Sequence, residues 1–121
     1  MKQKILAGVL LIVVISAVTA NTFILLKQID SCIEAVENII LEDSEAQNQA
    51  EMIFDDFLNK EKYISLTVSH EDLTSIEDCF AEMIGYLSVG DTENAQVTKS
   101  RLIHSLKHLR RLSGFNLDSI I

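Results

Sequence analysis

A run of 22 uncharged residues near the N-terminus, Ile5 to Leu26, constrains this chain more than any other feature. Lys4 precedes the run and Lys27 follows it. As a helix rising about 1.5 Å per residue, the run would span roughly 33 Å, close to the roughly 30 Å hydrocarbon core of a bilayer. A helix that is apolar on every side is rarely needed in a small soluble core. The sequence therefore predicts a segment that inserts into lipid.

Two alternatives explain this segment. In the first, residues 1–27 are a permanent transmembrane anchor with a short cytoplasmic N-terminus. In the second, they are a signal peptide cleaved near Ala20, because Val18-Thr19-Ala20 resembles a small-residue cleavage site. The apolar run continues past Ala20 to Leu26, and cleavage would leave that end on a soluble product. We therefore favour the anchor.

The charges that flank the segment predict its orientation. Lys2 and Lys4 lie on the short N-terminal side, whereas the other side offers Lys27 and then the acidic Asp30. Cationic flanks tend to remain in the cytoplasm. We expect a single-pass protein of the cytoplasmic membrane, with its N-terminus inside and an extracytoplasmic helical domain over residues 28–121.

The composition limits what this domain can be. The chain has 121 residues, with 10 Lys and Arg against 18 Asp and Glu and a net charge of −8. Such an acidic balance argues against nucleic-acid binding, which needs a basic surface. No proline and four glycines leave little turn chemistry for a many-stranded sheet.

Past Lys27 the apolar residues recur at steps of three and four, which predicts that the membrane helix continues to about Leu41 as an amphipathic stalk. The apolar stripe of this stalk must be buried, and the helices that follow are the nearest candidates to cover it. Ile29, Cys32, Val36 and Ile39 or Ile40 also approximate the seam of a coiled coil, so the stalk is a possible site of homo-oligomerisation.

Three further helices are predicted, which gives an all-α fold: a transmembrane helix that continues into a stalk, plus a small antiparallel bundle. Ser44 in a capping box, Ser69 and Asp91 are expected to begin these helices. Gly90 and Gly114 are expected to end the last two of them, because glycine readily adopts the left-handed conformation found after helices.

Helical spacing also assigns the core of this bundle. Gly85, inside the second of the three helices, costs about 1 kcal/mol relative to alanine and is interpreted as a close helix–helix approach or a tolerated weak spot. The expected core residues are Ala46, Ala50, Ile53, Phe54, Phe57, Leu58 and Ile64, then Leu73, Ile76, Phe80, Met83, Ile84 and Leu87, and then Ala95, Leu102, Ile103, Leu106, Leu109 and Leu112.

A basic stripe marks the last helix: Arg101, His104, His108 and Arg111 follow one another at steps of three and four. In a hairpin turning near Gly90, this stripe would face an opposing stripe on the preceding helix. That opposing stripe consists of Glu71, Ser75, Asp78 and Glu82.

The basic stripe has two interpretations. In the structural one, its charges pair across the hairpin and set the register of the two helices, with little effect on stability. In the functional one, it binds an anionic surface or partner, with the histidines adding charge below about pH 6.5. We favour the structural interpretation and keep the stripe as a possible interaction site.

We predict no catalytic residue, no cofactor and no metal site. His104 and His108 could share a metal ion, but the sequence fixes no third ligand nearby. Cys32 and Cys79 could form a disulfide in an extracytoplasmic domain or remain as free thiols that pack like small apolar residues. No Ser/His/Asp or Cys/His arrangement has a recognisable spacing, and so few glycines leave no phosphate-binding loop.

Three segments carry a resemblance to a known family: Ser-His-Glu-Asp-Leu at Ser69–Leu73, the turn from Tyr86-Leu87 to Gly90-Asp91, and Phe-Asn-Leu-Asp-Ser-Ile-Ile at Phe115–Ile121. In these segments and in its layout, the chain resembles small bacterial proteins of the domain of unknown function 4363 family. The resemblance implies one N-terminal membrane helix followed by a helical remainder, and it implies no activity.

These features predict a single-pass membrane protein that presents a small acidic helical bundle, as a non-enzymatic binding or assembly module of the cell envelope. Its expected partners are the lipid bilayer, along Ile5 to Leu26, and an unknown protein, with no nucleic acid. The alternative is a secreted helical protein that binds a ligand or metal after cleavage near Ala20.

Overall fold

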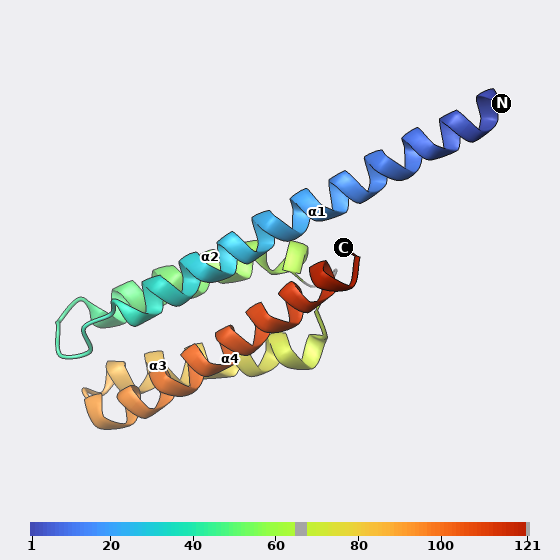
Figure 1. Cartoon of the computed structure of the whole chain (residues 1–121). Coiled ribbons are helices and arrows are strands. Elements are labelled where there is room, and N and C mark those ends of the chain that lie inside the picture. The colour runs from blue at the N-terminus through green and yellow to red at the C-terminus, as the bar shows by residue number, and fades with distance from the viewer. Residues whose placement is uncertain (65–67, 121) are drawn as a thin grey trace.

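Four helices follow one another in the computed structural model, which describes residues 1–64 and 68–120 and, within these, every side chain except those of Tyr63 and residues 114–120. They are α1 (Lys2–Glu37), α2 (Ala46–Ile64), α3 (His70–Ser88) and α4 (Thr92–Ile120). Figure 1 shows that successive helices alternate in direction and that α1 extends far beyond the other three. The all-α fold predicted from the sequence is confirmed.

The first helix divides into two parts with different surroundings. From Lys2 to Asn21 its side chains are exposed, apart from the half-buried Thr19, and this part projects from the other helices (Figure 1). One face of α1 becomes buried from Thr22, two residues after Ala20. The buried residues of α1 are Thr22, Leu25, Ile29, Ile33 and Val36. A single unbroken helix thus joins a largely exposed segment to a segment inside a core.

The predicted stalk is the first helix of a four-helix bundle. Its second part lies against α4 and α2, while α3 lies between α2 and α4. The expectation that the following helices cover the apolar stripe is confirmed. Ile29 and Val36 are 2% and 0% exposed within the single chain, so a coiled coil through them would require this bundle to open.

The α1 helix ends at Glu37 rather than near Leu41, because a side chain from α4 takes up the carbonyl groups at its C-terminal end. Nζ of Lys99 donates hydrogen bonds to the carbonyl oxygens of Glu37 (3.1 Å) and Ile39 (2.9 Å). Carbonyl groups in the last turn of a helix lack partners within that helix. Lys99 therefore both caps α1 and ties the loop after it to α4.

An aromatic cluster occupies the centre of the core. The ring of Phe80 in α3 stacks on Phe54 in α2, with centroids 5.0 Å apart, and lies 5.7 Å from the ring of Phe57. Phe80 itself is fully buried. Most of the expected core is confirmed, but the assignments of Leu58 and Leu112 are wrong, since these side chains remain 39% and 38% exposed at the edges of their helices.

Two buried hydroxyl side chains in α4 were not expected in the core. Thr98 and Ser113 are nearly inaccessible, yet each hydroxyl donates a 3.0 Å hydrogen bond to the carbonyl four residues earlier, that of Asn94 and of Leu109. Because both polar groups are satisfied within the helix, burying them carries little penalty.

The predicted start of α3 and turn into α4 are confirmed. The side chain of Ser69 accepts a hydrogen bond from the backbone N–H of Asp72 (3.3 Å), and Oδ1 of Asp91 accepts one from that of Asn94 (3.1 Å). Gly90 has φ of +73°, the left-handed conformation that other residues adopt at a cost.

Two local predictions are wrong. The capping box at Ser44 does not form; instead Oδ1 of Asp43 accepts from the N–H of Glu45 (3.1 Å), and the Gln47 side chain donates to Glu51 (3.3 Å). At the other end, α4 continues through Gly114 to Ile120. Glycine weakens a helix without terminating it, and no proline follows to do so.

Gly85 and Gly90 provide a matched test of this fold. A Cβ added at Gly85 meets nothing within 4 Å, so the close-approach interpretation is wrong and the residue is a weak spot in α3. We expect Gly85→Ala to raise the free energy of unfolding by about 1 kcal/mol. Gly90→Ala should lower it by about 1 kcal/mol, because φ is positive there. Urea unfolding followed by circular dichroism measures both, and a destabilising Gly85→Ala would contradict the open surroundings of this residue.

Candidate functional site

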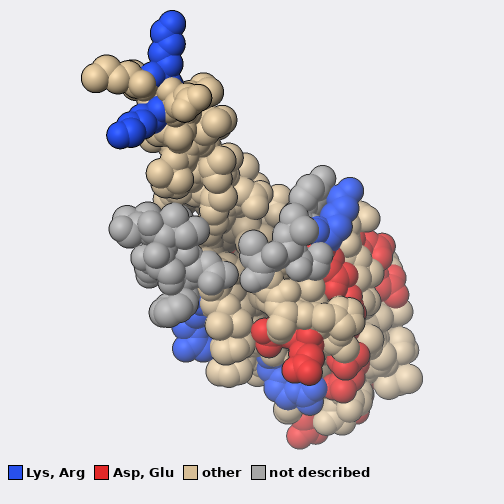
Figure 2. All heavy atoms as spheres, turned by 90° about the vertical axis from the view of Figure 1, so that its right-hand side faces the viewer, with Lys and Arg blue, Asp and Glu red and all other residues tan. Residues whose placement is uncertain are grey.

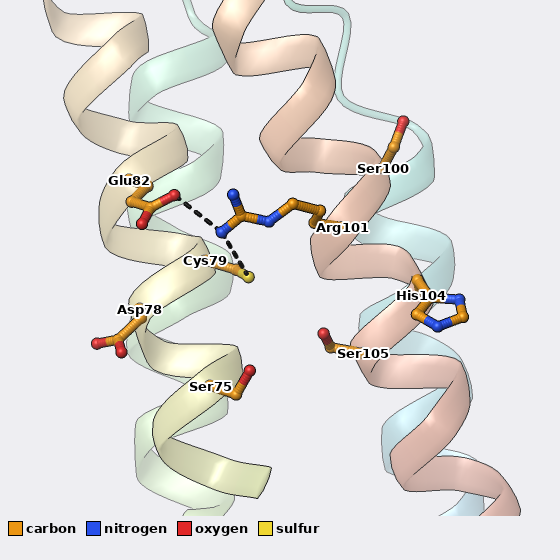
Figure 3. Close-up of a pocket in the computed structure, with 8 residues that line it drawn as sticks. All are labelled: Ser75, Asp78, Cys79, Glu82, Ser100, Arg101, His104 and Ser105. Atoms are coloured by element: carbon orange, nitrogen blue, oxygen red, sulfur yellow. Dashed lines mark hydrogen bonds and ion pairs between the residues drawn. The ribbon is translucent and has the colours of Figure 1, made fainter. Parts of the chain in front are cut away.

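The α3–α4 hairpin brings the two predicted stripes together. Because the helices are antiparallel and turn at Gly90, residues whose numbers sum to about 180 lie level, which places Arg101 beside Cys79. A shallow groove of about 440 Å³ runs along this flank of the hairpin (Figure 3). Its lining consists of Ser75, Asp78, Cys79, Glu82, Ser100, Arg101, His104 and Ser105.

Arg101 is the residue that joins the two walls of this groove. Its Nη2 donates to Oε2 of Glu82 at 3.0 Å and to Sγ of Cys79 at 3.8 Å, as the dashed lines in Figure 3 show. The hydrogen bond with the Cys79 thiol raises the pKa of Arg101 most, and the negative charge of Glu82 raises it further. The side chains of Arg101 and Glu82 are about half exposed, so water screens their attraction. This ion pair joins α3 and α4, and its effect on the register of the hairpin stays a prediction.

The rest of the basic stripe follows α4 away from this ion pair. His104 and His108 border a smaller hollow of about 220 Å³ with Asp72, Ser75 and Ser105. Arg111 is exposed about one turn further along. Within residues 1–64 and 68–120, no three His, Cys, Asp or Glu side chains are grouped so as to hold a metal ion.

A second basic flank of α4, facing α1, was missed by the sequence reasoning. Lys107 pairs with Glu37 at 3.6 Å, and Nε of Arg110 donates to Oδ1 of Asp30. Lys99 on the same flank binds the end of α1. Lys99, Ile103, Lys107 and Arg110 follow one another at steps of four and three residues, which indicates that they share one face of the helix. This pattern could not be interpreted because the partners lie 60 to 80 positions earlier.

The two cysteines are free thiols in different places. Cys32 is half-buried on α1, where burial, helped by the charge of Asp56 and opposed by that of Lys60, raises its pKa to about 11. Its thiol therefore stays protonated and unreactive near neutral pH. Cys79 is buried on α3 beside Arg101. The disulfide considered as one alternative does not form in this structure.

Two carboxyl groups meet where α2 approaches α3. A side-chain hydrogen bond with Glu77 raises the pKa of Glu61, and partial burial and the negative charge of Glu77 act in the same direction, while His70 opposes them. A hydrogen bond between two carboxyl groups requires a proton on one of them. The pair therefore retains a proton to a higher pH than isolated glutamates do.

With this geometry established, the comparison with known families is informative. Residues 14–120 match the family described as a domain of unknown function (DUF4363). The chain belongs to this family. The match confirms the resemblance seen in the sequence, and it covers the last part of the apolar run together with the α1 segment in the bundle and α2 to α4. No curated protein and no solved structure matches the chain.

The DUF4363 chain has a second candidate site in its projecting helix. Among the described residues, α1 is the one helix long and apolar enough to cross a membrane by length and composition. Figure 2 shows its free part as a column without acidic side chains that rises from a bundle carrying many of them. Asp30 is the first acid in the sequence, already inside the bundle segment.

Reversing the charge of Arg101 tests the role of the ion pair. We expect Arg101→Glu to lower the unfolding temperature by roughly 2–5 °C, since it replaces an attraction with a repulsion from Glu82. Adding Glu82→Lys should restore most of the loss, and Arg111→Glu should change little. Unchanged melting of Arg101→Glu would contradict a role in pairing and favour the functional interpretation of the stripe.

The Glu61–Glu77 pair predicts a pH dependence. Because the pKa of Glu61 is raised in the folded state, the stabilisation from its shared proton is complete below the ordinary glutamate pKa of about 4.3. It is lost as the pH rises through the folded-state pKa. Chemical unfolding should show that the free energy of unfolding falls between about pH 4 and pH 7. We expect this fall to be smaller in Glu61→Gln and unchanged in the control Glu34→Gln. Equal slopes in the two variants would contradict the shared proton.

Proposed function

We propose that this DUF4363 protein is a single-pass membrane protein that holds its four-helix bundle outside the cytoplasmic membrane, as a non-enzymatic binding or assembly module of the cell envelope. The observation that carries the proposal is the free part of α1. Lys2 to Asn21 is 20 residues long, or about 30 Å as a helix, and its side chains are exposed on every side apart from the half-buried Thr19. A bilayer supplies the surroundings that such a surface requires.

Burial in lipid explains why large apolar side chains face outward around the whole circumference of α1. Val9, Leu10 and Leu11 occupy three successive directions and are 51%, 57% and 61% exposed. A soluble helix with this pattern would present a continuous apolar surface and aggregate. The polar side chain of Thr22, at the base of the free part, donates a 2.9 Å hydrogen bond to the carbonyl of Val18, so it adds no unsatisfied group there.

The orientation rests on the flanking charges. Lys2 and Lys4 lie at the free end of the helix, and the other end enters an acidic bundle through Lys27 and Asp30. Under the positive-inside rule, the free end stays in the cytoplasm and the bundle faces outward.

The binding role rests on what the bundle offers. Its core is completed by α1, so the anchor and the domain share one continuous helix. The α3–α4 groove remains open beside Arg101 and His104. We propose a protein partner for this surface. Substrate turnover by the purified bundle, abolished by a single polar substitution, would contradict the non-enzymatic role.

One observation favours cleavage near Ala20 as the alternative. Burial in the bundle begins at Thr22, so a chain cleaved after Ala20 would keep every core residue. Against this, Phe23 and Ile24 are 60% and 57% exposed and would remain on the surface of the secreted product. The N-terminal residue of the mature protein separates the two proposals, since cleavage leaves Asn21 first and an anchor leaves Met1 or Lys2.

A buried charge tests insertion directly. We expect Val13→Lys, in the middle of the free part, to cost about 3 kcal/mol of insertion free energy and to release the protein into the soluble fraction during alkaline extraction. The matched control is Met52→Lys, which adds the same charge to a side chain that is 71% exposed on α2 and should leave the protein in the membrane. Extraction of the unmodified protein by alkali would contradict the anchor.

A further inference from the structure

A cleft lies beside α1 where this helix leaves the bundle. Its volume is about 450 Å³, and it is lined by Phe23, Ile24, Leu26 and Lys27 on one turn of α1, by Asp30 one turn further, and by Arg110 from α4. These residues place the cleft between α1 and α4, and α4 continues beyond Arg110 to Ile120. Figure 1 shows α4 running beside α1 in this part of the bundle.

The two sides of this cleft differ in chemistry. Phe23 and Ile24 form an apolar wall that is more than half exposed. Lys27 and Arg110 supply two cationic groups at the other side. Oδ1 of Asp30 accepts from Nε of Arg110, which orients the guanidinium while leaving its terminal N–H groups to donate elsewhere. Lys27 is an exposed ammonium group on a flexible stem.

The position of the cleft along α1 matches the boundary between lipid and water. The uncharged run from Ile5 to Leu26, about 33 Å as a helix, ends immediately before Lys27. In the proposed orientation, the apolar wall is level with the outer ends of the acyl chains, and Lys27 and Arg110 are level with the phosphate groups. Lysine and arginine at this depth attract anionic headgroups.

This end of the bundle is less acidic than the other. Lys60 and Lys62 in the last turns of α2, and Arg111 in α4, lie toward it, together with the acids Glu61, Glu71 and Asp72. The opposite end is acidic, with Glu42, Asp43 and Glu45 between α1 and α2, and Asp91 and Glu93 between α3 and α4.

We propose that this cleft binds an anionic glycerophospholipid, with Lys27 and Arg110 holding its phosphate and Phe23 and Ile24 in contact with the start of an acyl chain. The inference rests on the membrane anchor proposed above and adds a specific ligand to it. The bound lipid would fill the corner between α1 and α4 and fix the bundle against the bilayer surface.

Counting the lipids that remain bound tests this site. The full-length protein is reconstituted in nanodiscs containing equal amounts of phosphatidylglycerol and phosphatidylcholine, transferred to a mild detergent and examined by native mass spectrometry. We expect it to retain phosphatidylglycerol in preference to phosphatidylcholine. Lys27→Gln and Arg110→Gln should each weaken this preference roughly five-fold, whereas the matched control Arg111→Gln should not.

The possible outcomes separate this inference from the anchor. A protein that resists alkaline extraction but retains both lipids equally would overturn the lipid site and leave the anchor in place. An equal loss in Arg111→Gln would also overturn it, since diffuse surface charge would then be sufficient. A protein that alkali extracts would remove both proposals. Among the side chains that the structure describes, Lys27 forms no ion pair, so the effect of Lys27→Gln separates lipid binding from loss of folding.

Discussion

α1 is one continuous helix that lies in two different surroundings, and the placement of the other helices follows from this. The helix has no break between Lys2 and Glu37, yet its surroundings change at Thr22, where largely exposed side chains give way to a packed core. Because a helix transmits rotation and tilt along its length, the face of α1 that carries Leu25, Ile29 and Val36 determines how the bundle is turned relative to the free part. Lys99 and Arg110 then hold α4 against that same segment.

This arrangement gives α4 the central place in the bundle. One flank pairs with α3 through Arg101 and Glu82, and the other pairs with α1 through Lys107 and Arg110. The basic residues of an otherwise acidic chain therefore serve two interfaces at once. Each exposed ion pair contributes little to stability, and we expect their common effect to be the choice of one register among the antiparallel helices.

Local chemistry predicted some helix boundaries correctly but not the start of α2 or the end of α4, and it could not reveal distant partners. The helix starts at Ser69 and Asp91 and the turn at Gly90 follow from capping and backbone preferences within a few residues. The end of α1 does not, because Lys99, 60 positions away, satisfies its carbonyls. The facing of the two stripes beside Arg101 could be predicted, because a short hairpin fixes which residues of α3 and α4 lie level. The cleft beside Arg110 could not, because it depends on α1 packing against α4, which the spacing of residues does not reveal.

The central claim is that α1 leaves protein and enters lipid near Thr22. A scan of single spin labels measures this. Labels are placed one at a time from Leu6 to Val36 in a reconstituted chain whose two cysteines are replaced by alanine. The accessibility of each label to oxygen and to a water-soluble nickel complex is then measured. We predict high oxygen access on every face before Asn21, and after Thr22 a period of 3.6 residues with minima at Leu25 and Ile29. A period of 3.6 residues throughout the first part, or high access of the nickel complex there, would contradict the claim.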